Sequence, residues 1–211
     1  MPRPGSQLVV LALGFATLGA GSPEPAIVAA GELLPAQRLL GTEPPEVVAE
    51  LLEEGSLVLD CPGDLINAYV IFERPVERVY ELLSATARQA EYRSELASLE
   101  MVEQTADGQI DEHHIRIVFV NVAYRLRYHL DPARRRIAWE LDPDFESAMR
   151  RVEGFWELYE MDASRTLGRF ATGVDVSEAL PEFLEEAVTR KTLPRTLERC
   201  RRWVNADGEE P

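Results

Sequence analysis

The chain of 211 residues has few of the residue types and motifs from which most chemical centres are built. It has two cysteines and three histidines, and no CxxC, HExxH or similar cluster with metal-ligand spacing. No GxSxG motif surrounds a serine, and there is no glycine-rich loop of the kind that cradles phosphates. We therefore predict no metal and no cofactor, and we assign no catalytic residue.

Basic residues are also scarce, with 22 Lys and Arg against 37 Asp and Glu and a net charge of −15. An acidic protein is repelled by phosphate backbones and anionic headgroups, so no nucleic-acid partner is expected. The excess of acid is typical of a soluble, well-solvated surface.

The N-terminus has no apolar run long enough to cross a bilayer comfortably, which takes roughly 20 residues. Its apolar run, Leu8–Leu18, follows Arg3 and precedes small residues. This pattern predicts a signal-peptide-like segment over 1–26, cut near Ala20 or Ala26, and export to the periplasm or the exterior with no stable membrane span afterwards. Without the cut, the segment would tether the protein to the membrane. A third interpretation is that the start of the chain is wrongly assigned, because only one basic residue precedes the run.

The two cysteines leave open whether a disulfide forms. An exported protein with an even number of cysteines permits one. Cys61, however, precedes the first strand of the main domain, and Cys200 lies late in the last helix. Cysteines so far apart are more often independent small apolar residues.

The composition divides the remainder of the chain into three parts. Residues 27–60 are rich in Pro, Glu and Ala and predict a helical annex, with short helices at Gly31–Leu40 and Pro45–Glu54. Residues 61–205 form the main domain, and 206–211 are expected to be a disordered tail.

Strand-like runs with turn residues between them dominate the main domain. After the first run, Pro75 opens a predicted helix, and a second short helix is expected at Ala85–Tyr92. Most runs alternate apolar and polar residues, which indicates antiparallel pairing with one buried face. Ser56–Leu59 is a possible additional short strand. The predicted strands are Ile66–Glu73, Leu96–Gln104, Gln109–Val120, Ala123–Leu130, Arg135–Leu141, Arg151–Glu160 and Arg165–Val176.

A long helix, predicted from about Pro181 to Asn205, closes the chain. Its apolar residues form two stripes that are out of phase, and Pro194 lies where one changes to the other. Because proline removes a backbone hydrogen bond and clashes with the preceding turn, we predict a kink near Pro194. The alternative is a continuous helix with a broad apolar face and a mild bend.

The order strand, two helices, six strands, long helix resembles the helix-grip fold of the START-like superfamily (SRPBCC proteins), which includes polyketide cyclases, coenzyme Q-binding proteins and lipid-transfer domains. Local similarity lies in Val70–Leu83, Gly154–Leu158, Thr166–Phe170 and Leu180–Pro181, with Arg74 standing where a small residue is more usual. The resemblance implies an α+β fold, in which a curved antiparallel sheet of about seven strands is closed by the C-terminal helix. It also implies a hydrophobic cavity between the two.

Inward-facing strand residues and the last helix supply the candidate ligand-binding residues. A cavity of this kind suits a lipid, a sterol, a quinone or an aromatic polyketide. The alternative for any one of these residues is that it fills the core. Tyr124, Tyr128 and Trp156 are favoured, because each has a polar atom that a ligand can satisfy. The candidates are Ile117, Phe119, Tyr124, Tyr128, Trp139, Trp156, Phe170, Phe183 and Leu184.

Three functions remain open at this point. The first is binding or transport of a hydrophobic small molecule. The second is an aromatase/cyclase-type enzyme, for which His113, predicted to point inward, is a candidate acid or base. The third is an interaction protein whose annex, residues 31–60, docks on a partner or fills the groove. The oligomeric state is not predicted.

Overall fold

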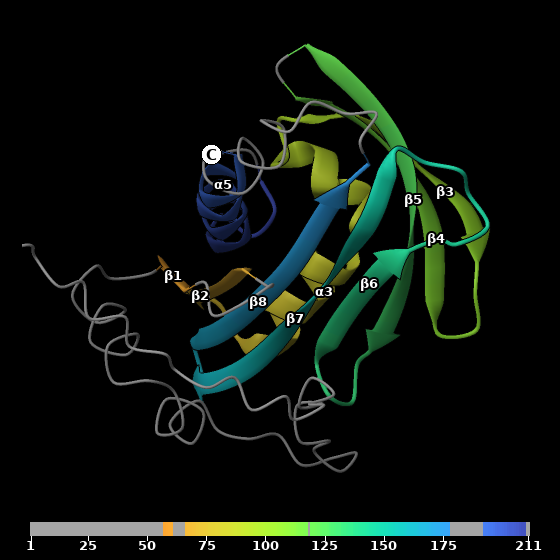
Figure 1. Cartoon of the computed structure of the whole chain (residues 1–211). Coiled ribbons are helices and arrows are strands. Elements are labelled where there is room, and N and C mark those ends of the chain that lie inside the picture. Colours follow the sequence, from red (N-terminus) through yellow and green to blue (C-terminus); the bar gives the residue numbers. More distant parts are fainter. Residues whose placement is uncertain (1–56, 61–65, 118, 178–191, 210–211) are drawn as a thin grey trace, which may run out of the picture.

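One antiparallel sheet organises the part of the chain that the structure describes. The computed structural model describes residues 57–60, 66–117, 119–177 and 192–209 (Figure 1). Eight strands pair in the order β1-β2-β8-β7-β6-β5-β4-β3, and every pairing is antiparallel. The strands are β1 Leu57–Asp60, β2 Ile66–Phe72, β3 Leu96–Gln104, β4 Gly108–Ile117, β5 Val120–Asp131, β6 Arg136–Leu141, β7 Met149–Asp162 and β8 Arg165–Val176.

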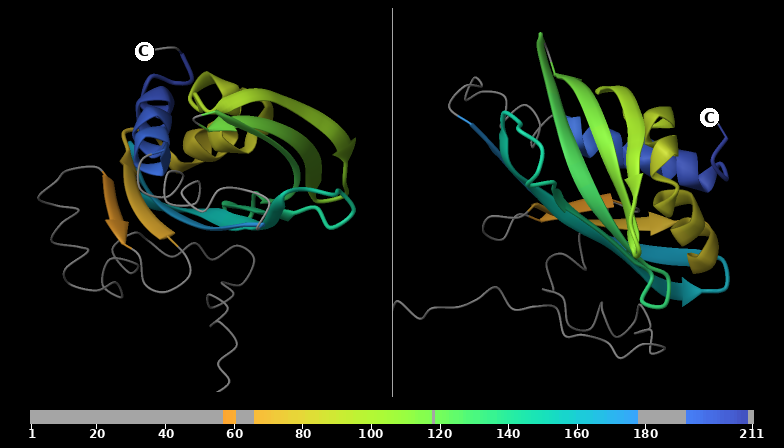
Figure 2. Two further views of the ribbon diagram at one scale, coloured as in Figure 1. Left: turned by 45° about the horizontal axis from the view of Figure 1, so that its top comes forward. Right: turned by 90° about the vertical axis from the view of Figure 1, so that its right-hand side faces the viewer.

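The described helices lie on one side of this sheet (Figure 2). They are α3 (Val76–Ser84), the 3₁₀ helix η1 (Thr86–Glu91) and α5 (Leu193–Asn205). The seven strands predicted for the main domain are present, with bounds that differ by a few residues. The eighth, β1, belongs to residues assigned to the annex and extends the sheet by pairing with β2. The predicted α+β helix-grip architecture is confirmed.

The predicted alternation places the core on the side of the sheet that faces the helices. In β5, Tyr124, Leu126 and Tyr128 are buried, and the residues between them are partly exposed. Val76, Val79, Leu82 and Leu83 of α3 pack against that core, as their helical spacing predicts. Pro75 precedes α3 instead of opening it, because its ψ of 148° is extended.

Of the predicted closing helix, about Pro181 to Asn205, the structure describes only the part from Thr192 onward. α5 begins at Leu193, so Pro194 lies in its first turn, where a missing backbone N–H costs little. Residues 178–191 lie outside the described residues, and the kink near Pro194 stays a prediction. The stripe of Leu197, Cys200 and Val204 is buried, as expected.

The predicted disordered tail is wrong for residues 206–209, which cap α5. Asp207 is in the left-handed region with φ 64°, and its N–H donates to the carbonyl of Val204 at 2.9 Å. Gly208 donates to the carbonyl of Trp203 at 2.9 Å, which completes a Schellman cap. The Asp207 carboxylate also pairs with Arg78 at 2.7 Å.

Gly154 lets β7 pass close to its neighbours. A Cβ atom at this position would lie 2.5 Å from Trp139 Cζ2 and would also clash with the carbonyl oxygen of Ala171. Gly154→Ala is therefore expected to lower the free energy of unfolding by about 1–3 kcal/mol, the usual cost of overpacking. Urea denaturation measures the change, and an unaltered midpoint would contradict this close packing.

Candidate functional site

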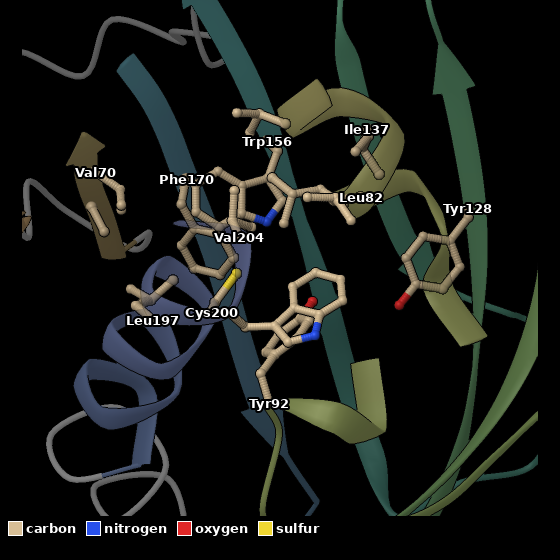
Figure 3. Close-up of a cluster of buried hydrophobic side chains, with 14 of the residues drawn as sticks. Val70, Leu82, Tyr92, Tyr128, Ile137, Trp156, Phe170, Leu197, Cys200 and Val204 are labelled. Atoms are coloured by element: carbon tan, nitrogen blue, oxygen red, sulfur yellow. The ribbon is translucent and has the colours of Figure 1, made fainter. Parts of the chain in front are cut away.

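A cavity lies between the inner face of the sheet, η1 and α5. It has a volume of about 160 Å³. Figure 3 shows several of its side chains converging from both layers. Its wall includes Ile66, Leu83, Gln89, Tyr92, Arg93, Glu95, Ile115, Tyr124, Leu126, Tyr128, Ile137, Trp139, Met149, Val152, Trp156, Phe170, Thr172, Val174, Val176, Thr192, Leu193, Thr196, Leu197 and Cys200.

This volume is smaller than that of typical small-molecule pockets, whose range begins at roughly 300 Å³. The space of 160 Å³ in this cavity resembles that of an apolar cavity of about 150 Å³ that holds benzene. The described walls therefore leave room for a group of the size of one aromatic ring. A whole sterol or a long acyl chain would need more room.

The structure brings most of the predicted binding residues together. Tyr124, Tyr128, Trp139, Trp156 and Phe170 all line the cavity. Contact of these residues with a ligand stays a prediction. Phe183, Leu184 and the side chain of Ile117 lie outside the described residues.

Phe119 is the predicted residue that the structure places elsewhere. Its side chain is 90% exposed, and it is not part of the cavity wall. Ile117 pairs with Val120 across the β4–β5 hairpin, so Phe119 falls in the turn and not in a strand. The prediction for Phe119 is wrong because the apolar alternation of β4 ends at Ile117, where the hairpin turns.

An aromatic wall forms one side of the cavity. The ring of Phe170 lies 4.9 Å from that of Trp156 and 5.6 Å from that of Trp139, measured between centroids. Tyr128 continues the row, 6.4 Å from Trp139. Tilted rings at these separations attract one another beyond their area of contact, and the wall that they form presents mainly carbon to the cavity.

A polar wall, which is not evident from the sequence, faces the cavity from η1 and the residues after it. Arg93 donates through Nε to Glu95 at 2.9 Å and through Nη1 to the side-chain oxygen of Gln89 at 2.8 Å. Gln89 in turn donates to the hydroxyl of Tyr128 at 3.0 Å. Thr196 of α5 donates to the second oxygen of Glu95 at 3.2 Å. The network fixes Arg93 in one orientation.

Two groups of this wall keep unused hydrogen-bonding capacity. Guanidinium has five N–H donors, and the hydrogen bonds of Arg93 to Glu95 and Gln89 use two of them. The hydroxyl of Tyr124 makes no hydrogen bond to any residue within the described ranges, although its side chain is only 4% exposed. A ligand oxygen in the cavity would give these donors a partner.

His113 lies beside the polar wall, buried as predicted from its strand parity. Its ring stacks on Tyr124 with centroids 5.2 Å apart, and its Nε2 is 3.4 Å from the hydroxyl of Tyr128. Its Nδ1 is buried without a hydrogen-bond partner among the residues described. Burial, together with the positive charge of Arg93, lowers the pKa of His113 well below 6.5, so the ring is neutral at pH 7.

The lowered pKa makes the folded protein sensitive to acid. The unfolded chain takes up a proton at His113 near pH 6.5, and the folded chain resists it. Stability is therefore lost as the pH falls from about 6.5, by up to about 1.4 kcal/mol per pH unit. His113→Gln is expected to flatten this part of the profile in urea denaturation at stepped pH. The exposed His114→Gln is the control, and equal slopes for wild type and His113→Gln would contradict the assignment.

Cys200 contributes a buried thiol to the cavity wall. Burial raises the pKa of this thiol to about 12, so it stays protonated and behaves as a small apolar group. Cys200 is a free thiol in the structure, and Cys61 lies outside the described residues. Among the described residues, no group of His, Cys, Asp and Glu has the arrangement of a metal site. No helix in these ranges has the length and apolar character needed to span a bilayer.

Solved structures with the same arrangement of sheet and helix include a START superfamily protein from Mycobacterium smegmatis. It aligns with a TM-score of 0.58 and 14% identity over 68% of this chain and 99% of its own. The chain has the START-like helix-grip fold. The Zhui aromatase/cyclase from Streptomyces sp. R1128 aligns at 0.58 with 19% identity, over 68% of this chain and 92% of its own. A STAR-related lipid transfer protein from Xanthomonas axonopodis aligns at 0.55 with 16% identity, over 70% and 92%.

These likenesses concern the START-like fold, because every identity is below 20%. No protein-family model matches the chain, and no curated protein matches it in sequence. A fold of this kind hosts unrelated functions, so the function has to be argued from the residues of the cavity.

Proposed function

We propose that the protein binds a hydrophobic small molecule in the cavity between the sheet and α5, as a carrier or a receptor. The observation that carries the proposal is the pairing of an aromatic wall with a polar wall that has open hydrogen-bond donors. Small-molecule sites combine these two elements: an apolar surface supplies affinity, and a few fixed polar groups set the orientation. The solved structures with this fold include a STAR-related lipid transfer protein, which supports a binding role.

The cavity narrows the class of ligand. A ring that bears an oxygen, such as a quinone or an aromatic ketone, fits a volume of about 160 Å³ and satisfies the Tyr124 hydroxyl and Arg93. The ring then lies against Trp156 and Phe170. Any alkyl remainder would extend along Ile66, Val174 and Val176, which are apolar parts of the same wall.

Acetophenone and ethylbenzene test this orientation, because they differ mainly in the carbonyl oxygen. Tyr124→Phe is expected to weaken the binding of acetophenone by about 0.5–1.5 kcal/mol, which is about twofold to tenfold in Kd. The Kd of ethylbenzene is expected to stay unchanged. Titrations followed by NMR chemical shifts give both constants. An equal loss of affinity for the two ligands would show that Tyr124 shapes the cavity without donating a hydrogen bond to the carbonyl oxygen.

The natural ligand is best sought in protein purified from its own host. Native mass spectrometry of the full chain is expected to show a bound mass that organic extraction removes. A chain that carries no such mass, and that binds neither acetophenone nor ethylbenzene, would overturn the proposal.

An aromatase/cyclase-type activity is the second candidate, favoured by the neutral His113 next to the hydroxyl of Tyr128. Tyr128 lines the cavity, and burial raises its pKa. In this case Tyr128→Phe and His113→Gln would each abolish cyclisation of a linear poly-β-ketone thioester. Both variant proteins would still bind the cyclised product. Failure of the wild type to turn over such thioesters would leave the binding role alone.

Export of the protein is part of the same proposal and rests on the apolar run Leu8–Leu18. N-terminal sequencing of the protein from its host is expected to find a start near residue 21 or 27. An intact Met1 in the soluble cell fraction would contradict export.

A further inference from the structure

Strand β2 is buried on both of its faces. All six residues from Asn67 to Phe72 are buried. Val70 and Phe72 belong to the core beneath the helices, whereas Tyr69 and Ile71, 3% and 8% exposed, point the opposite way and do not belong to that core. Strands with two buried faces need a layer on each side.

The same outer face continues across β8 and β7. Leu167 and Ala171 are fully buried there, beside Ile71 and Asn67 in the register. Phe155 and Tyr159 of β7 are their partners on the next strand. We call the six residues Tyr69, Ile71, Phe155, Tyr159, Leu167 and Ala171 the outer patch. The helices α3, η1 and α5 all lie on the other side of the sheet, so none of them covers it (Figure 2).

The rest of the outer face is different. Across β4 it presents Glu112, His114 and Arg116, and across β5 Arg125 and Arg127. These charged side chains are partly or fully exposed. The buried part of the outer face is therefore confined to the half of the sheet next to β1. It extends over the three strands β2, β8 and β7, a width that one helix can cover.

Two arginines and one glutamate border the outer patch, so its surroundings are positively charged on balance. The guanidinium groups of Arg136 and Arg169 lie 5.0 Å and 5.6 Å from the ring centroid of Phe155. Both pair with one carboxylate, Glu157, at 3.4 Å and 3.9 Å. Arg169 Nε is buried without a hydrogen-bond partner among the described residues. An apolar partner with acidic side chains would complement this surface.

The chain itself contains such a segment, just before β1. Pro45–Glu54 (PEVVAELLEE) is expected to be helical from its spacing. Val47, Val48, Leu51 and Leu52 fall on one face, and four glutamates accompany them. Two residues, Gly55 and Ser56, separate Glu54 from Leu57, and the three steps from Glu54 to Leu57 span about 10 Å when extended. β1 pairs with β2, and β2 with β8; two strand spacings are also about 10 Å. The linker therefore reaches the patch.

We propose that Pro45–Glu54 packs in cis on the outer patch and forms a third layer on the sheet, opposite the cavity. The proposed signal segment ends well before it, so the layer would persist after export. The apolar face of the helix covers Tyr69, Ile71 and Leu167. Its glutamates approach Arg136 and Arg169.

Photo-crosslinking in the full chain tests the layer. Benzoylphenylalanine replaces Phe155, which keeps an aromatic ring on β7 within the outer patch. After irradiation, mass spectrometry is expected to find a cross-link to the peptide containing residues 45–54, in the monomer band of a denaturing gel. Benzoylphenylalanine at His114, on the charged half of the same face, is the matched control and should not capture that peptide.

Two further variants make the result specific. Val47→Asp with Leu51→Asp places charge on the apolar face and is expected to abolish the cross-link from position 155. Glu53→Gln with Glu54→Gln should retain it. A cross-link found only in the dimer band would show that a second copy covers the patch and would overturn the proposal. A cross-link to another peptide, or none, would also overturn it.

Discussion

Replacing Trp203 with alanine is expected to lower the free energy of unfolding by about 3–5 kcal/mol. The side chain is 1% exposed and lies where α5 meets η1. Its ring is 5.1 Å from that of Tyr92, and the guanidinium of Arg88 lies 4.8 Å from its centroid. Its Nε1 donates to Glu91 at 2.9 Å. The substitution therefore opens a cavity and removes a hydrogen bond at the joint between the two helices.

Urea denaturation followed by far-UV circular dichroism gives the change directly. Trp203→Phe keeps most of the ring and loses only the indole N–H, so a smaller loss is expected. The carboxylate of Glu91 holds Arg88 at 2.8 Å in the wild type, and this ion pair does not need the indole N–H. A change within about 0.5 kcal/mol for Trp203→Ala, the range of ordinary surface substitutions, would show that α5 is not anchored through this residue.

Arg93→Met is expected to cost about 3–5 kcal/mol of stability, because it removes one partner of a largely buried ion pair. Glu95 would keep its charge at 11% exposure with only the Thr196 hydroxyl beside it. Gln89 would lose the donor to its side-chain oxygen. The polar wall of the cavity would lose its fixed geometry together with its cation.

A double-mutant cycle separates the charge effect from the loss of packing. In Arg93→Met with Glu95→Gln, no buried charge is left without a partner, so most of the lost stability is expected to return. The double variant should nevertheless bind acetophenone more weakly than the wild type. Additive losses in the double variant would contradict the coupling of Arg93 to Glu95.

The apolar half of the site could be predicted from sequence, because side chains alternate between the two faces of a strand. This alternation alone shows which residues belong to the buried face. Tyr124, Tyr128, Trp156 and Phe170 were all identified in this way. Phe119 was the exception, since strand periodicity does not show where a hairpin turns. The alternation in β4 ends at Ile117.

The polar half could not be predicted, because its residues are buried by parts of the chain far away in sequence. Arg93 and Glu95 stand in a short charged stretch that alone indicates a solvated turn. The contact that encloses Glu95 comes from Thr196, 101 residues later. Trp203 was missed for a related reason: it lies beside the apolar stripe of α5 and is buried only because η1 packs on that side.

We propose that a ring-sized ligand lies between the aromatic wall and the polar wall. Nuclear Overhauser effects between acetophenone and the isotope-labelled full chain test it most directly. We expect contacts from the ligand ring to the ring protons of Trp156 and Phe170, with the acetyl group nearer to Tyr124. Contacts confined to surface residues such as Phe119, or saturable binding with no contact to Trp156 or Phe170, would contradict it.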